Sequence, residues 1–475
     1  MLSRLVAAAA AALAIAAAPA TAQALPTDLT LGFSGADSVL SSSDATTNAL
    51  WTARAHAVGT QITRLDVTWA AVAPAVRPSG FVAANPSSPG YDWDTVDTQV
   101  RDLTAEGFKI LLSISVAPAW AEGTHMPKSA GPGSWRPNPA ALGAFATAIA
   151  RRYSGGFPDP LHQGKKLPRV GDWQVWNEPN LGVYLAPQWT KTSAGWQPES
   201  ALIYRSLENV FYAAVTGVNK SNYVVAAGTA PYGDPPGGQR MPPVTFDEAM
   251  FCLSSELKRL SCPDPVHLDA IDHHPYGIYG PTWHALDPGD VAVADIYKLT
   301  KVLDTAERAG TVLPGGPKQV WVTEVSWNTD PPNPGGVPLM KAADWLEQTF
   351  YVLWSQGVST IMWYQLVDGP PAANYLDAYQ AGVYLLNGTA KPGAVAFRFP
   401  FLTNRLNPAE VEAWGRAPAS GKLVIEMLTQ GQWRVVDRLT VHADDVFEAP
   451  IALTGKGSLR AQLAGETSLV WQQGA

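Results

Sequence analysis

Charged residues are few in this sequence, and they form no block of one sign. Asp, Glu, Lys and Arg together make up 16% of the 475 residues, and the formal net charge is −8. A protein that follows a phosphate backbone needs clustered Lys or Arg, so we expect no nucleic-acid partner. A Gly-x-Ser-x-Gly elbow and nucleotide or metal motifs are also absent, which disfavours a serine hydrolase and predicts that no cofactor is needed.

Long apolar runs are absent after residue 24, so we expect no membrane-spanning helix and no membrane partner. Residues 1–24 have the parts of a secretory signal: Arg4 near the start, an apolar stretch over 5–18, and small residues at Ala22 and Ala24. An N-terminal anchor is the alternative, but the stretch is short for a span and rich in Ala. We therefore expect cleavage near Ala24 and secretion of the rest.

Cysteine is nearly absent: the chain has only Cys252 and Cys262. Two cysteines without a histidine cluster argue against a zinc site, and we expect no metal. The two lie close in sequence, in a chain expected to reach an oxidising compartment. A local Cys252–Cys262 disulfide is the favoured interpretation, and two free buried thiols are the alternative.

Tryptophan, by contrast, is abundant, with 18 residues. Its flat apolar face packs well against sugar rings, although most tryptophans in any protein belong to the core. The count therefore favours a carbohydrate partner only modestly.

Short apolar runs alternate with helix-like segments in the first 400 residues, as in successive βα units. Several runs are almost continuously apolar, which is typical of parallel strands that are covered on both faces. Long Pro- and Gly-rich connections follow the second, third, fifth and seventh runs, where barrel enzymes build their sites. We predict an α/β fold, a (β/α)8 TIM barrel over 25–402, with strands at 29–34, 61–69, 108–117, 172–178, 223–229, 268–276, 319–327 and 359–366.

The pattern changes at about residue 403 to short alternating strands separated by turn residues. Such a pattern predicts a small all-β sandwich over 403–475, which we expect to pack on the barrel as an accessory domain. Its expected strands are 423–428, 433–441, 451–453, 459–463 and 468–471.

Two carboxylates stand at the ends of predicted barrel strands. Glu178 lies in the run Trp-Asn-Glu-Pro-Asn after the fourth strand, and Glu324 lies in the otherwise apolar seventh strand, Val-Trp-Val-Thr-Glu-Val. A lone charge in such a strand is costly unless it is used. A capping or surface role for Glu178 and a salt-bridged core role for Glu324 are the bland alternatives. Glu122 is a competing carboxylate, but it lies in a loop without the Asn-Glu-Pro context.

The Asn-Glu-Pro run resembles the acid/base motif of clan A (β/α)8 glycoside hydrolases, which include families 5, 10 and 39. That clan has its acid/base after strand four and its nucleophile at the end of strand seven. The resemblance implies a retaining O-glycosyl hydrolase with Glu178 as acid/base and Glu324 as nucleophile. One carboxyl must be protonated to expel the leaving oxygen, while the other must be ionised to attack the anomeric carbon.

The same resemblance assigns supporting groups. Asn177 would bind the substrate 2-hydroxyl, and Arg64 would lie beneath the nucleophile and keep its pKa low. Tyr276 would donate to Glu324, with His274 beside it. A structural pair with Asp66 is the alternative role for Arg64.

Adjacent His273 and His274 point to opposite faces of a strand, which argues against a metal cluster. By resemblance to the clan, Trp363 would form the floor of the sugar subsite. Trp120 resembles a sugar-contacting loop of family 39 relatives.

The Arg-Leu-Asp segment of strand two, the Pro-Ala-Trp loop and the β-domain favour a family 39-like enzyme, with a family 5-like endoglycanase as the alternative. The expected activity is cleavage of a polysaccharide or oligosaccharide by a monomeric enzyme. The rival hypothesis is a secreted carbohydrate-binding protein that kept the barrel and lost catalysis.

Overall fold

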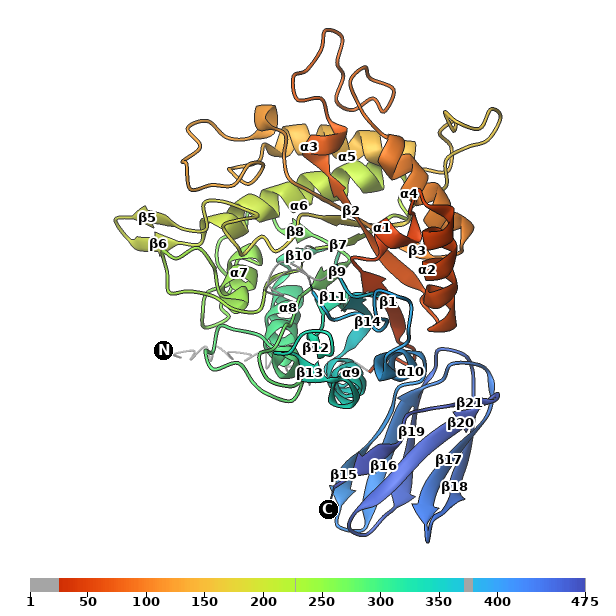
Figure 1. The fold of residues 1–475 in the computed structure, drawn as a ribbon. Coiled ribbons are helices and arrows are strands. Elements are labelled where there is room, and N and C mark those ends of the chain that lie inside the picture. Colours follow the sequence, from red (N-terminus) through yellow and green to blue (C-terminus); the bar gives the residue numbers. More distant parts are fainter. Residues whose placement is uncertain (1–24, 227, 371–378, 475) are drawn as a thin grey trace, which may run out of the picture.

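The computed structural model describes residues 25–226, 228–370 and 379–474, so the predicted signal at 1–24 lies outside the described residues. Eight parallel strands close into a barrel in the order β1-β14-β11-β9-β7-β4-β3-β2 (Figure 1). Each predicted run overlaps one of them, which confirms the barrel. The strands are β1 (Thr30–Ser34), β2 (Ile62–Thr68), β3 (Lys109–Ser115), β4 (Asp172–Val175), β7 (Tyr223–Val225), β9 (Ala270–Asp272), β11 (Gln319–Val325) and β14 (Val358–Tyr364).

Alternation along the strands divides the apolar residues between the inside of the barrel and the surrounding helices. In β3, Leu111 belongs to the cluster inside the barrel, whereas its neighbour Leu112 belongs to the large core beneath the helices. Gly32 lies where β1 approaches β2 closely, because a Cβ there would be 2.0 Å from the carbonyl oxygen of Ile62. The interior cluster consists of Ile62, Leu111, Val225, Ala270, Trp321 and Met362.

Helices cover the outside of the barrel. Helix α5 begins where Asn138 accepts the backbone N–H of Ala141 through Oδ1 at 3.0 Å, and Pro139 occupies its first position. The helices are α1 (Asp37–Leu40), α2 (Ala45–Ala57), α3 (Trp69–Val72), α4 (Asp94–Ala105), α5 (Pro139–Arg152), α6 (Glu199–Val218), α7 (Pro243–Met250), α8 (Tyr297–Ala309), α9 (Leu339–Trp354) and α10 (Pro392–Arg398), with 3₁₀ turns η1 (Ala119–Ala121) and η2 (Val293–Asp295). Short pairs in the connections are β5 (Thr190–Thr192) with β6 (Gly195–Gln197), β8 (Val266–His267) with β10 (Val312–Leu313), and β12 (Thr329–Asp330) with β13 (Val337–Pro338).

Two antiparallel sheets follow α10 and enclose a separate apolar core, which confirms the predicted C-terminal all-β fold. One has the order β15-β16-β19, and the other contains β18-β17-β20-β21 with β22 beside β20. The first two strands of this region were not expected from the sequence. The strands are β15 (Phe401–Asn407), β16 (Glu410–Arg416), β17 (Gly421–Thr429), β18 (Gln432–Val441), β19 (Val446–Ala452), β20 (Gly457–Leu463), β21 (Glu466–Thr467) and β22 (Trp471–Gln473).

The β-sheets dock on the barrel beside α9 and α10 (Figure 1). Trp414 of β16 packs against Trp354 at the end of α9, with ring centroids 5.7 Å apart. Arg416 is buried, and it donates to the Leu29 carbonyl at 2.7 Å, to Gln61 Oε1 at 2.7 Å and to Asp444 Oδ1 at 2.6 Å. One side chain thus joins the β-domain to the segments that precede β1 and β2.

We expect Arg416→Met to lower the free energy of unfolding by about 2–4 kcal/mol, because the buried Leu29 carbonyl and the half-buried Gln61 and Asp444 lose their donor. Urea unfolding monitored by tryptophan fluorescence measures the change. Arg434→Met is the control, since Arg434 is exposed on β18. Equal midpoints for the two variants would contradict the assigned role of Arg416.

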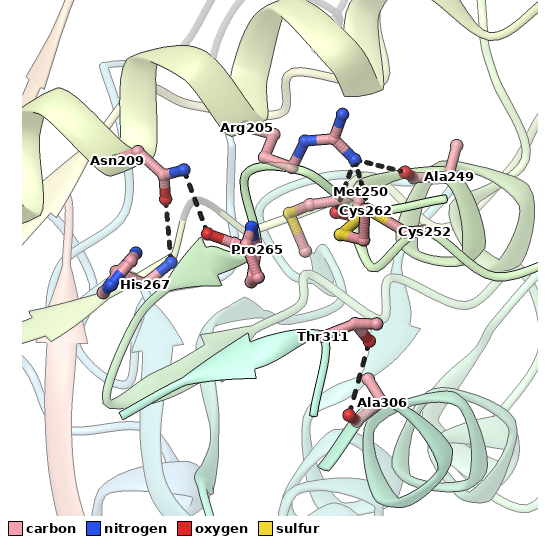
Figure 2. The surroundings of a disulfide bond; sticks show 10 residues. All are labelled: Arg205, Asn209, Ala249, Met250, Cys252, Cys262, Pro265, His267, Ala306 and Thr311. Carbon is pink, nitrogen blue, oxygen red and sulfur yellow. Dashed lines mark hydrogen bonds between the residues drawn. A yellow bond between two sulfur atoms is a disulfide. The ribbon is translucent and has the colours of Figure 1, made fainter. Parts of the chain in front are cut away.

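Cys252 and Cys262 form a disulfide in the segment after α7 (Figure 2). Arg205 of α6 holds this segment from the side, with Nη1 2.8 Å from Cys252 Sγ and 3.4 Å from the Ala249 carbonyl. Asn209, one turn further along α6, donates to the Pro265 carbonyl at 3.1 Å. The disulfide therefore belongs to a peripheral excursion that is fastened to α6.

Candidate active site

A cavity of about 490 Å³ opens among the loops that follow the barrel strands. Its walls include Asp66 of β2, Asn177 and Glu178 after β4, Tyr276 after β9, and Glu324 of β11. The carboxyl ends of the strands are where a (β/α)8 barrel presents its functional side chains. Both carboxylates singled out from the sequence therefore line one cavity.

Glu178 lies on an unusual stretch of backbone. Strand β4 ends at Val175, and the chain then adopts positive φ at Trp176 (74°) and at Glu178 (38°). Non-glycine residues rarely adopt this region, and such strain persists only where the surroundings enforce it. Here the Trp176 backbone N–H donates to the Ile114 carbonyl at 2.5 Å, and its indole donates to the Tyr184 carbonyl at 2.8 Å.

Asn180 fixes the same loop from the other side. Its fully buried amide accepts from the Ala230 N–H at 2.7 Å and donates to the carbonyls of Ala230 and Met241, both at 2.9 Å. The loop after β4 is thereby tied to the loop after β7. Asn180 had no predicted role, although it belongs to the Asn-Glu-Pro-Asn run.

Glu324 accepts two hydrogen bonds from below and beside it. Arg64 Nη1 lies 2.5 Å from Oε1, and the Tyr276 hydroxyl donates to Oε2 at 2.9 Å. Both contacts are those expected from the sequence. Burial together with the charge of Glu324 raises the pKa of Tyr276 well above its usual range, so this hydroxyl remains a donor.

Arg64 is buried and organises the cavity floor. Besides Glu324, it contacts Asn177 Oδ1 at 2.8 Å, Ser113 Oγ at 3.2 Å and Asp66 Oδ1 at 3.2 Å. Its pKa is raised because the neighbouring carboxylates outweigh burial, which acts in the opposite direction. The pairing with Asp66 and the contact with the carboxylate of Glu324 therefore coexist. Since Arg64 occupies Asn177 Oδ1, the Asn177 amide nitrogen is the remaining donor.

His274 lies between the two carboxylates. Its Nδ1 is 3.0 Å from Glu178 Oε1 and 3.8 Å from Glu324 Oε2, and oxygens of the two carboxyls lie within 4.8 Å of each other. Its Nε2 faces Thr323 Oγ1 at 3.0 Å and Asp272 Oδ2 at 3.6 Å. Burial alone would lower the pKa of His274, but the surrounding carboxylates, Glu324 foremost, raise it to about 10.

The three ligand atoms of Glu178, His274 and Glu324 are close enough together to be a potential cation site. A protonated His274 opposes that use, because both ring nitrogens then carry hydrogens and neither offers a lone pair. Its charge also neutralises part of the negative charge that a cation would need. The absence of a metal remains a prediction.

His273 points away from the cavity, as expected for the neighbour of His274 on a strand. It lies 2.8 Å from Thr229 Oγ1 through Nδ1 and 2.9 Å from the Val291 carbonyl through Nε2. Burial lowers its pKa to about 4. Two adjacent histidines thus have pKa shifts of opposite sign.

These opposite shifts predict a specific pH dependence of stability. The pKa of His274 is about 10 in the folded state, against an ordinary value of 6.5. The contribution of His274 to the free energy of unfolding is therefore complete below pH 6.5 and is lost as pH rises toward 10. We expect the stability gap between wild type and His274→Gln to shrink over that range by several kcal/mol, ~1.4 kcal/mol per pKa unit. Urea unfolding at pH steps from 6 to 10 measures it.

His273→Gln is the control for this series. The pKa of His273 is lowered to about 4, so its contribution is present above pH 6.5 and is lost as pH falls toward 4. Its effect should change on the acid side, whereas that of His274→Gln should change on the alkaline side. A stability gap for His274→Gln that is constant from pH 6.5 to 10 would contradict the assignment.

The two tryptophans assigned to the sugar site lie elsewhere. Trp363 is buried beside Phe350 and Trp327, and its indole donates to the Ala381 carbonyl at 2.8 Å. Its neighbour Tyr364 lines the cavity instead. Because Met362 belongs to the barrel interior, alternation directs Trp363 outward toward the helices.

Trp120 is half-buried against Trp69, with ring centroids 5.8 Å apart, and its indole donates to the Pro74 carbonyl at 2.8 Å. It packs the loops after β2 and β3 together and is not part of the cavity wall. Four tyrosines that were not predicted as site residues supply aromatic walls: Tyr184, Tyr232, Tyr364 and Tyr379. Burial raises the pKa of Tyr184 and that of Tyr364 to about 12, so both are neutral hydrogen-bond donors.

Comparison with known proteins supports the fold. No protein-family model matches the sequence, and no curated protein matches it. Among solved structures, the chain is similar to a family 39 glycoside hydrolase from the gut symbiont Bacteroides cellulosilyticus WH2, with 16% identity, a TM-score of 0.53, and coverage of 90% of this chain and 81% of that one. It is also similar to a glucosidase from Croceicoccus marinus, with 12% identity, a TM-score of 0.51, and coverage of 90% and 94%.

The resemblance in fold to clan A glycoside hydrolases is thereby confirmed.

Among the described residues, no helix is both long and apolar enough to cross a membrane.

Proposed function

We propose that this protein is a secreted retaining glycoside hydrolase that cleaves a polysaccharide or oligosaccharide by double displacement. The observation that carries the proposal is the pair Glu178 and Glu324 at the carboxyl ends of β4 and β11, with carboxyl oxygens within 4.8 Å. Retaining pairs lie ~5–5.5 Å apart, whereas inverting pairs lie ~6.5–9.5 Å apart to admit a water. The spacing here favours direct attack by a carboxylate. The two structural neighbours named above are a family 39 glycoside hydrolase and a glucosidase.

In the first step, Glu324 attacks the anomeric carbon while the bond from that carbon to the leaving oxygen breaks. Glu178 gives its proton to the leaving oxygen. Arg64 and Tyr276 hold the carboxylate of Glu324 in place through the two hydrogen bonds described above. In the second step, Glu178 removes a proton from water, the water oxygen bonds to the anomeric carbon, and Glu324 leaves as a carboxylate.

Asn177 is placed to recognise the sugar. Its Oδ1 is held by Arg64, so the amide nitrogen remains a donor in the cavity that both carboxylates line. A hydrogen bond to the 2-hydroxyl that strengthens in the transition state is the contribution that the clan resemblance assigns to it. The reaction requires no cofactor, since the two carboxyls supply both the nucleophile and the proton.

Hydrolysis of a panel of aryl glycosides and polysaccharides, compared between wild type and Glu324→Gln, tests the proposal. With the best substrate, NMR of the first product formed should show the anomeric configuration of the substrate. Inverted product would exclude double displacement. Glycan binding without turnover of any substrate by the wild type would instead support the rival hypothesis of a carbohydrate-binding protein.

A further inference from the structure

The loop between β9 and η2 carries a group of exposed apolar side chains. Tyr279 and Trp283 expose 60% and 62% of their surface, and Ile278 and Leu286 on the same loop expose 74% and 98%. The rings of Tyr279 and Trp283 lie side by side, with centroids 5.2 Å apart and planes at 44°. We call Tyr279 and Trp283 the aromatic pair.

The loop that carries the aromatic pair is fastened to the barrel. Buried Asp295 accepts from the Ala285 N–H at 2.7 Å and contacts His284 Nδ1 at 2.9 Å, so one carboxylate holds two consecutive residues of the loop. Gly280 packs directly on Trp345 of α9, where an added Cβ would come within 2.8 Å of the indole. The loop backbone that carries the exposed rings is therefore held in place before any ligand arrives, which reduces the entropy cost of binding.

Tyr232 connects the aromatic pair to the catalytic cavity. It lines that cavity, and it also lines a hollow of about 220 Å³ that contains Tyr279 and Trp283. Tyr232 is thus shared by both walls, and the two walls form one continuous surface. Tyr232 lies in the loop after β7, and β7 is next to β4 in the barrel. Because Glu178 follows β4, this surface extends from the side of the cavity on which Glu178 lies.

We propose that the aromatic pair is a distal subsite for a polymeric glycan, on which sugar rings beyond the cleaved bond stack. This inference rests on the proposed function and specifies its substrate as a polymer. Aromatic faces stack on the apolar faces of sugar rings. Asp287 and Asp290 also line the hollow, and such carboxylates disfavour anionic sugars, so the ligand class is a polysaccharide of neutral residues.

Binding is tested in the Glu324→Gln background, so that the polymer is not consumed. Affinity electrophoresis with soluble xylan, mixed-linkage glucan, galactan and mannan identifies the polymer that retards the protein. Adding Trp283→Ala should weaken the retardation about tenfold, as expected for the loss of one stacking surface of ~1.4 kcal/mol. Trp283→Phe should restore most of it. Trp433→Ala, which removes a partly exposed tryptophan of β18, is the matched control and should bind normally.

Turnover separates this inference from the proposed function. In the active enzyme, Trp283→Ala should lower the ratio of kcat/KM on the polymer to kcat/KM on an aryl monoglycoside about tenfold, mainly through KM. No turnover of either substrate by the wild type would refute the proposed function. Normal polymer binding by Trp283→Ala, or no binding of any of the four polymers, would overturn the subsite, as would self-association of the wild type that Trp283→Ala abolishes in sedimentation velocity.

Discussion

Replacing Glu324 with alanine should reduce turnover by roughly 10⁴-fold or more, the scale of loss when an enzyme's nucleophile is removed. The carboxylate receives Arg64 Nη1 and the Tyr276 hydroxyl, and neither donor can attack carbon. Because the substitution leaves a small space next to the anomeric carbon, azide can enter it. Azide should restore activity and give a glycosyl azide of inverted configuration, since the reaction then has a single displacement.

The product configuration is measured by NMR, and the rates are measured on an aryl glycoside. Glu122→Ala is the control, because Glu122 accepts the Trp135 N–H at 3.0 Å and lies outside the cavity wall. An azide product of retained configuration from Glu324→Ala would assign the nucleophile to another residue. Activity close to wild type would exclude Glu324 from the reaction.

Replacing Glu178 with alanine should affect substrates according to their leaving groups. Substrates with poor leaving groups, including the natural glycan, should lose ~10²–10⁴-fold in rate, because the leaving oxygen no longer receives a proton. Aryl glycosides with acidic phenols need little protonation, so their first step should remain fast. Removal of the base slows only the second step, and a burst of phenol equal to the enzyme concentration should appear.

Stopped-flow measurement of phenol release detects the burst, and mass spectrometry detects the accumulated glycosyl-enzyme. Azide should accelerate the second step and give a glycosyl azide of retained configuration, because it attacks the covalent intermediate. Equal losses for good and poor leaving groups would show that Glu178 positions the substrate and does not transfer the proton. The control is again Glu122→Ala.

The barrel could be predicted because each of its strands is a short apolar run between turn residues. The places of Glu178 and Glu324 followed from the strand order, since the ends of parallel strands meet at one mouth. The contact of Tyr276 with Glu324 came from the clan resemblance. These features depend on local pattern and on one global rule, the closure of eight strands.

The cavity walls could not be predicted, because they depend on how long loops fold against each other. Asn180 acts through carbonyls some 50 and 61 positions away in sequence, and nothing local indicates those partners. Trp363 is a different case, because strand alternation could have excluded it: Met362 is inside the barrel, so Tyr364, two residues from Met362, faces the same way and Trp363 does not. Strand β15 was missed because the polar run over 403–405 interrupts its apolar residues.

The contact through Arg416 has a practical consequence for handling the protein. Its acceptors, the Leu29 carbonyl and Gln61, stand at the amino ends of β1 and β2, whereas the cavity opens at the carboxyl ends of the strands. The C-terminal sheets therefore contact the barrel toward the amino ends of these strands, away from the mouth. A support coupled to these sheets would hold the molecule with its mouth toward the solution, where an insoluble or very large glycan could still reach it.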